Sequence, residues 1–120
     1  MAKILVTGYE KDKSIQYLTS AGYEVETLAH NQADAYSPTM SMLEQVARLT
    51  NEYDAIVISH NNIAGLAIAD IVPKLYRSKA IVVTSGDLNP EHKLTYIQKG
   101  ITHFAQRDQI AKSLDELLKN

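Results

Sequence analysis

The residues that could form a chemical site in this 120-residue chain stand at the ends of short apolar or mixed segments. Hydroxyl, imidazole, guanidinium, amide and carboxylate groups all occur among them, and each can donate or accept hydrogen bonds. In chain order these candidates are Gly8, Tyr9, Glu10, Ser59, His60, Asn61, Asn62, Thr84, Ser85 and Arg107. Together such groups could surround an anion or a small polar metabolite, and one adjacent pair could supply a nucleophile and a base.

That pair is Ser59-His60. Catalysis would require the two side chains to lie within hydrogen-bonding reach, whereas adjacent residues leaving a strand point to opposite faces. No carboxylate is placed to orient the imidazole. A hydrogen-bonded strand terminus is the favoured interpretation, and we predict no catalytic residue. Asn61 and Asn62 can be interpreted as amides that contact a ligand or as turn residues, and the turn is favoured.

Several other kinds of site are excluded by residue type or spacing. The chain has no cysteine, which removes disulfides, thiolate metal sites and cysteine nucleophiles. Gly8 is followed by no glycine before Gly22, so the phosphate-binding glycine pattern of dinucleotide-binding proteins is missing. His30, His92 and His103 lack metal-ligand spacing, and we predict that they lie at the surface or at boundaries. We therefore expect neither a cofactor nor a metal.

The composition is that of a globular protein. Hydrophobic residues make up 45% and charged residues 22%, with a net charge of −2. One domain is expected over residues 1–120. The charge balance gives no reason to expect a nucleic-acid partner. No apolar stretch is long enough for a signal peptide or a membrane span, so we expect a cytoplasmic protein without membrane contact.

Five candidate strands position the polar residues. Three are continuously apolar and rich in β-branched residues, as strands buried on both faces of a parallel sheet are, and two mix apolar with polar residues. The apolar candidates are 4–6, 55–58 and 80–83, and the mixed candidates are 24–28 and 102–105. We expect the mixed strands at the two edges of the sheet.

Five helical segments alternate with the strands, each bounded by capping residues, proline or glycine. The five segments are 15–21, 37–47, 64–72, 89–99 and 108–118. Gly22, Pro73 and Gly100 follow the first, third and fourth segments, and Ser37-Pro38 and Asn89-Pro90 begin the second and fourth. Pro73 should end or kink the third helix. The fourth helix carries Leu94 and Ile97, and Asp108 is expected to cap the last.

This alternation predicts an α/β fold in which five helices cover both faces of a five-stranded parallel sheet through right-handed crossovers. Mixed strands at the edges select the order 2-1-3-4-5, a flavodoxin-like three-layer sandwich. In that order, ligands collect at the carboxyl ends of the strands where the sheet order reverses, between strands one and three.

Five segments carry a resemblance to a known family: KILVTG, AGYEVETL, YDAIVIS, AIVVTSG and KGITHFAQRD. In this order they resemble the receiver domain of response regulators over nearly the whole chain. Between Ala29 and Tyr53 the chain is longer than a typical receiver. The polar residues 29–36 within that stretch either carry function or form a neutral insertion.

The resemblance implies an altered phosphorylation pocket. Receivers carry an acidic pair after strand one, where this chain has Gly8 and Tyr9, and a phospho-accepting aspartate where it has Ser59. The hydroxyl residue after strand four is retained as Thr84. Arg107 replaces the lysine near the end of strand five, which keeps the charge and changes the geometry.

These differences remove the chemistry of phosphorylation. Mg²⁺ is held by carboxylates in receivers, and Glu10 alone leaves a poor site because Gly8 and Tyr9 have none. Serine at position 59 cannot form an acyl phosphate. We therefore expect a pseudo-receiver, meaning a receiver-like domain that is not phosphorylated on aspartate. Phe104 matches the aromatic residue of receivers and either forms a residual switch pair with Thr84 or simply packs in the core.

The expected function is regulation through contact with a protein partner or a second copy of the chain. The face implied by the resemblance comprises the fourth helix, the fifth strand and the last helix. Two alternatives remain. One is a small-ligand sensor or enzyme that uses Glu10, Ser59, His60, Thr84 and Arg107, and the other is a divergent receiver phosphorylated elsewhere, for instance on Asp87.

Overall fold

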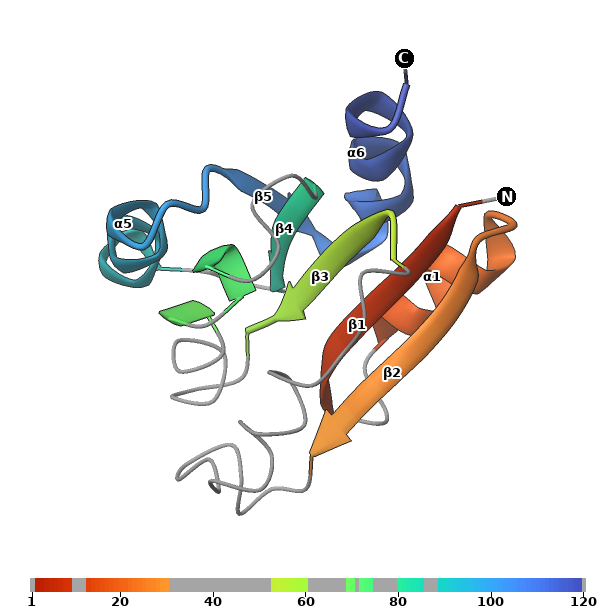
Figure 1. The fold of residues 1–120 in the computed structure, drawn as a ribbon, viewed down its shortest axis with the longest axis horizontal. Helices are drawn as coiled ribbons and strands as arrows, with labels where there is room; N and C mark the ends of the chain where they lie inside the picture. The colour runs from red at the N-terminus through yellow and green to blue at the C-terminus, as the bar shows by residue number, and fades with distance from the viewer. Residues whose placement is uncertain are drawn as a thin grey trace.

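The computed structural model describes residues 2–9, 13–30, 53–60, 69–70, 72–74, 80–85 and 89–119. Five parallel strands form one sheet (Figure 1) in the order β2-β1-β3-β4-β5. The strands are β1 (Lys3–Tyr9), β2 (Glu24–His30), β3 (Ala55–Ser59), β4 (Ala80–Ser85) and β5 (His103–Gln106). The predicted α/β fold and its strand order are confirmed.

Burial explains why this order forms. Every residue of β3 is buried, and β3 pairs with β1 on one side and β4 on the other. In contrast, His103 and Gln106 of the edge strand β5 are exposed. A strand that is apolar at every position must be covered on both faces, whereas an edge strand tolerates polar positions.

Helices cover the two faces of the sheet separately (Figure 1). On one face, α1 (Lys13–Ser20) and α6 (Ile110–Leu117) bury Leu18, Ile110 and Leu114 against β1, β3 and β4. On the other, α5 (Pro90–Gln98) buries Tyr96 with Ile56, Ile58 and Val83, alongside the helical residues Ala69 and Val72. The labels of the helices follow Figure 1.

Three of the predicted helix boundaries are confirmed: the start of α5 at Asn89 and the ends of α1 and α5 at glycines. Asn89 caps α5, and its Oδ1 accepts a hydrogen bond from the His92 backbone N–H at 2.9 Å, with Pro90 in the first turn. Gly22 and Gly100 each have a φ of +95° and follow α1 and α5. Only glycine adopts this backbone conformation without strain, which is why both helices stop there.

The last helix begins differently from the prediction. Residues Arg107–Gln109 form a 3₁₀ turn, η1, and α6 starts only at Ile110. Asp108 lies within that turn, and α6 has no side-chain cap at its start. The prediction that Asp108 caps the helix is therefore wrong, because β5 runs into a tighter turn before the α-helix begins.

Three further features differ from the sequence pattern: the lengths of the first two strands, the backbone around Pro73 and the buried side of α5. The first two strands are longer than predicted, so Gly8 and Tyr9 are the last residues of β1 and do not follow it. Residues 72–74 are helical, so helical backbone extends one residue past Pro73, and the predicted end or kink at this proline stays a prediction. Leu94 and Ile97 of α5 are 54% and 43% exposed, whereas Tyr96 is fully buried. The apolar residues named for this helix are thus not its core residues.

Two predictions fall outside the described residues. The helix over 37–47 does so entirely, as do residues 31–36 of the polar segment 29–36. Ala29 and His30 are the last two residues of β2.

Candidate functional site

The carboxyl edge of the sheet brings together residues from three strands. Ser59 ends β3 and lies in register with Thr84 of β4, and the His60 backbone N–H donates to the Thr84 carbonyl at 2.9 Å. Gly8 lies on the neighbouring strand β1, where Thr7 is in register with Ile58. The ends of β1, β3 and β4 therefore lie at one edge of the sheet.

Ser59 and His60 point to opposite faces of this edge. Strand alternation places Ser59 with Val57, on the face covered by α1 and α6, and His60 with Ile58, on the face covered by α5. The contacts of the imidazole with α5 agree with this assignment. The two side chains therefore point away from each other, which is unfavourable for a nucleophile–base pair.

His60 instead belongs to a cluster with two residues of α5. Its Nδ1 lies 2.6 Å from the Tyr96 hydroxyl oxygen, and its Nε2 lies 3.2 Å from His92 Nδ1. The His60 and Tyr96 rings meet edge to face, with centroids 5.5 Å apart. Residues 92 and 96 are one helical turn apart, so both face the end of β3 from the same side of α5.

Burial sets the charge state of this cluster. Burial, together with the positive charges of His92 and Arg107, lowers the pKa of His60 from 6.5 to about 4. Burial also raises the pKa of Tyr96 above its usual value. At neutral pH the His60 imidazole and the Tyr96 phenol are therefore both uncharged, and the pair is held by a neutral hydrogen bond.

Thr84 presents a different situation on the opposite face. Its side chain is fully buried, and its hydroxyl has no hydrogen-bond partner in the described part of the chain. Ser59, in register with it, is also buried. A buried hydroxyl without a partner is uncommon because losing its bonds to water costs free energy.

The remaining predicted site residues divide into two groups. Ser85 ends β4 and is half-buried, and Arg107 begins η1 directly after β5. Glu10, Asn61 and Asn62 lie outside the described residues, and nothing can be added to their predicted roles.

The predicted switch residues lie on different faces of the sheet. Phe104 is in register with Val83, and Thr84 is in register with Ala105, so alternation separates the two side chains. Phe104 packs instead against Tyr96, with ring centroids 6.2 Å apart. The Lys93 ammonium lies 5.3 Å from the centroid of the Phe104 ring. A switch that links Thr84 to Phe104 stays a prediction, and it would have to act through the strands.

His92 and Tyr96 were not among the residues predicted to form a site. His92 was expected at the surface or at a boundary, whereas it is half-buried and contacts His60. The i, i+4 spacing of His92 and Tyr96 after a strong helix cap was a usable signal, because it puts both on one face of the helix. The pairing with His60, 32 residues away, could not be read from spacing.

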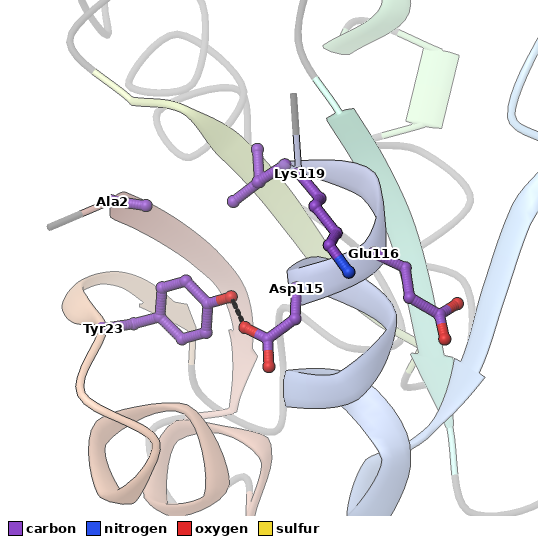
Figure 2. Close-up of a pocket in the computed structure, with 6 residues that line it drawn as sticks. Ala2, Tyr23, Asp115, Glu116 and Lys119 are labelled. Carbon is purple, nitrogen blue, oxygen red and sulfur yellow. Dashed lines mark hydrogen bonds between the residues drawn. The ribbon is translucent and has the colours of Figure 1, made fainter.

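A shallow pocket of about 420 Å³ lies at the opposite, amino edge of the sheet (Figure 2). It is lined by Ala2, Tyr23, Asp115, Glu116, Leu118 and Lys119. The hydroxyl of Tyr23, which precedes β2, donates a hydrogen bond to the carboxylate of Asp115 in α6. Burial, this hydrogen bond and the charge of Asp115 raise the pKa of Tyr23 to about 12. The contact ties the start of β2 to the last helix.

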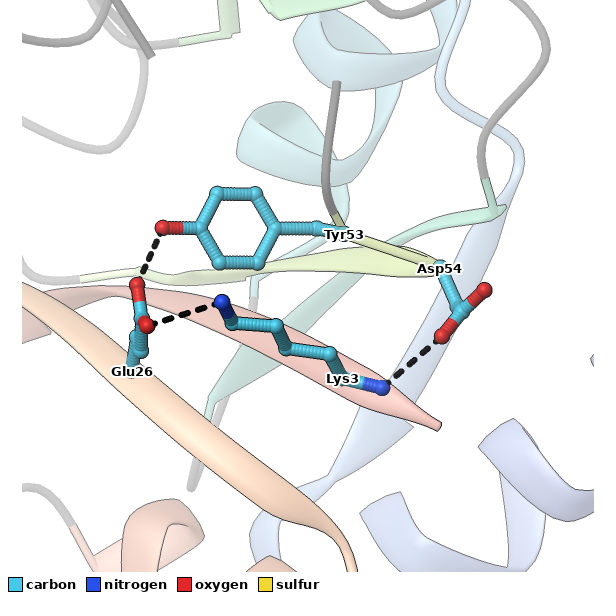
Figure 3. Close-up of polar contacts among 4 residues, drawn as sticks. All are labelled: Lys3, Glu26, Tyr53 and Asp54. Carbon is cyan, nitrogen blue, oxygen red and sulfur yellow. Dashed lines mark hydrogen bonds and ion pairs between the residues drawn. The ribbon is translucent and has the colours of Figure 1, made fainter. Parts of the chain in front are cut away.

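At the same edge, a polar network joins β1 and β2 to the two residues before β3 (Figure 3). Glu26 of β2 accepts a hydrogen bond from the Tyr53 hydroxyl and pairs with Lys3 Nζ at 3.0 Å. The Lys3 backbone N–H donates to Asp54 Oδ2 at 2.8 Å. The Tyr53 hydrogen bond, followed by the contacts with Lys3, lowers the pKa of Glu26. This network fixes β1 and β2 to the residues that lead into β3.

The described residues contain no group of three or more histidine, cysteine or carboxylate side chains placed to hold a metal ion. Within the same part of the chain, no helix has the length and apolar character needed to cross a membrane.

The fold is similar to that of response-regulator receiver domains. A receiver domain protein from Methanospirillum hungatei JF-1 superposes with a TM-score of 0.71 at 16% identity, covering 98% of this chain and 94% of that one. The chemotaxis protein CheY4 of Vibrio cholerae gives a TM-score of 0.66 at 23% identity, covering 99% and 97%. NtrX from Brucella abortus gives 0.70 at 23% identity and covers 98% of this chain, which spans only 26% of NtrX. No protein-family model and no curated protein matches the sequence.

Proposed function

We propose that this protein is a receiver-type regulatory domain of the cytoplasm that is not phosphorylated on aspartate and acts through protein–protein contact. The observation that carries the proposal is Ser59, which is buried at the carboxyl end of β3 in register with Thr84. The resemblance to receivers puts the phospho-accepting aspartate at this position. A serine hydroxyl there cannot form the acyl phosphate on which receiver signalling depends.

The neighbouring strand supports the same proposal. Gly8 and Tyr9 end β1, where the resemblance places the acidic pair that holds Mg²⁺. Mg²⁺ requires hard oxygen ligands in a near-octahedral arrangement, and carboxylates supply them in receiver pockets. Without them, neither the metal nor the charge on a transferred phosphoryl group is stabilised.

Protein contact is proposed through the face that α5, β5 and α6 form. Leu94 and Ile97 lie one turn apart on the outer side of α5, and each exposes about half of its surface. Large apolar side chains that are exposed together on one helix are typical of contact surfaces. The occupant is proposed to be another protein or a second copy of the chain.

Phosphorylation is tested with a small phosphodonor. The purified protein is incubated with acetyl phosphate and Mg²⁺, next to a receiver with an intact acidic pocket, and both are measured by intact-protein mass spectrometry. The proposal predicts that only the control gains one phosphoryl group. Incorporation that disappears in the Asp87→Asn variant would instead establish the divergent receiver.

The contact face is tested with a photoreactive amino acid placed in the native host at position 94 or 97. Gln16, exposed on α1 on the other side of the sheet, is the matched control position. The proposal predicts a discrete crosslinked species from positions 94 and 97 and none from position 16. Equal crosslinking from all three positions would argue against a specific face.

A second candidate function is supported by the buried Thr84 hydroxyl, which has no partner among the described residues. A small anion at the carboxyl edge could accept its hydrogen bond, and the positive charge of Arg107 reaches this region. Thermal unfolding in the presence of phosphate and nucleotides tests this function. A rise in the melting temperature that the Thr84→Val variant abolishes would favour the small-ligand sensor.

A further inference from the structure

The two imidazoles at the carboxyl edge have a separation that matches two ligands of one metal ion. His60 Nε2 and His92 Nδ1 lie 3.2 Å apart. Two nitrogen ligands that each bind a tetrahedral cation at about 2.0–2.1 Å are separated by about 3.3 Å. The observed distance is therefore close to the one that a shared cation would set.

The distance between the two ring centroids is consistent with the same interpretation. Their centroids are 4.8 Å apart, and their planes are inclined by 52°. A straight N–H···N hydrogen bond of this length would hold the centroids about 5.5 Å apart. Two histidines on one tetrahedral cation would hold them at about 5 Å. The rings are thus bent toward each other more than a straight hydrogen bond requires.

The surroundings orient one of the two nitrogens for this role. The Tyr96 hydroxyl lies 2.6 Å from His60 Nδ1 and can accept its proton, which leaves the lone pair of Nε2 free to face His92. Histidines that bind metals usually donate their second N–H to a neighbouring oxygen in this way. His60 is only 9% exposed, whereas His92 is half-buried, so a cation would enter from the His92 side.

We propose that His60 Nε2 and His92 Nδ1 together bind one late first-row divalent cation, such as Zn²⁺, Ni²⁺ or Cu²⁺. Imidazole nitrogen suits these cations and not Mg²⁺ or Ca²⁺, which prefer oxygen. The described residues supply these two ligands, and solvent completes the coordination. A bound cation would join the end of β3 to the first turn of α5.

Calorimetric titration of the untagged protein with NiCl₂ and ZnCl₂ tests the proposal. We expect saturable binding of one cation per chain, and no heat with MgCl₂. Either His60→Gln or His92→Gln should weaken binding by at least about tenfold, because glutamine keeps hydrogen-bonding groups but is a poor ligand for these metals. His103→Gln, at an exposed histidine of β5, is the matched control and should bind as the wild type does.

Electron paramagnetic resonance of the Cu²⁺-loaded protein provides an independent measurement. The wild type should show nitrogen hyperfine structure from two imidazoles, and His92→Gln should show it from one. His92 is the safer substitution because it is half-buried, whereas changing the buried His60 could disturb the fold. Two results would overturn the proposal: no binding of Ni²⁺ or Zn²⁺ up to about 1 mM, or wild-type affinity in the His60→Gln/His92→Gln double variant.

Discussion

Single residues at the carboxyl edge show two opposite hydrogen-bonding situations. His60 is buried and has its ring nitrogens next to the Tyr96 hydroxyl and His92. Thr84 is fully buried, but its hydroxyl has no partner among the described residues. Because an unmade hydrogen bond in a protein interior costs more than a made one gains, substitutions at the two places should have opposite effects on stability.

Removing the Tyr96 hydroxyl should destabilise the protein. Tyr96→Phe leaves the shape of the core unchanged but deprives His60 Nδ1 of its partner. We expect the free energy of unfolding in urea to fall by about 1–3 kcal/mol. Tyr17→Phe is the matched control, because Tyr17 is 40% exposed on α1, and it should change stability by less than about 0.5 kcal/mol. Equal effects of the two variants would show that the contact with His60 contributes nothing.

Removing the Thr84 hydroxyl should stabilise the protein. Thr84→Val replaces a buried hydroxyl by a methyl group of similar size, and the free energy of unfolding should rise by about 1 kcal/mol. The measurement is urea denaturation in a buffer without phosphate. A loss of stability of the same size would mean that the hydroxyl is bonded in solution.

At the scale of helices and strands, the sequence was informative about what is buried and less so about which side chains meet. The runs 55–58 and 80–83 are apolar at every position, and such runs form central strands whatever surrounds them. In α5, by contrast, the apolar Leu94 and Ile97 point outward, and the polar-tipped Tyr96 fills the core because its hydroxyl finds His60. That preference depends on a residue far away in the chain and could not be read from helical spacing.

The start of α6 shows a second limit. Asp108 has the residue type of a helix cap, yet the chain enters the helix through the turn Arg107–Gln109. The position of β5 relative to α6 sets the angle of entry, and this angle is a property of the packed sheet. Capping signals therefore located the helix correctly and its first residue incorrectly.

The network between β1, β2 and the residues before β3 should make stability depend on pH. The pKa of Glu26 is lowered from 4.5 in the folded protein, so its ionised form is favoured by folding. The resulting stability is fully present above about pH 4.5 and is lost as the pH falls through the lower pKa of the folded state. Urea denaturation of the wild type between neutral pH and pH 3 should show this loss.

Glu26→Gln isolates the contribution of the carboxylate. The variant should be less stable than the wild type at pH 7, and the difference between the two should shrink as the pH falls below about 4.5. Glu116, an exposed carboxylate of α6, is the control position for the same substitution. A constant difference over the whole pH range would contradict the role assigned to this network.

At the scale of the whole molecule, the two edges of the sheet differ in what they hold. The amino edge is closed by Lys3, Glu26 and Tyr53 and by the contact between Tyr23 and Asp115. The carboxyl edge carries Ser59, Thr84 and the histidine pair. This division suits a domain in which one edge fixes the sheet and the other edge binds or signals.

The free energy of unfolding of a small protein is typically only about 5–15 kcal/mol. Leu114→Ala empties a fully buried position of α6 and should lower the free energy of unfolding by about 2–5 kcal/mol. The same substitution at Leu94, which is 54% exposed on α5, should change it by less than about 0.5 kcal/mol. Similar losses at both positions would mean that the outer side of α5 is covered in solution.

The central proposal is that the carboxyl edge does not act as a phosphorylation pocket, and amide NMR tests it most directly. The protein is titrated with Mg²⁺ and then with beryllofluoride, which mimics an acyl phosphate. We predict that the signals of Gly8, Ser59, Thr84 and Arg107 do not move in either step. Shifts of these signals at sub-millimolar Mg²⁺, followed by further shifts with beryllofluoride, would show that the pocket still functions and would contradict the claim.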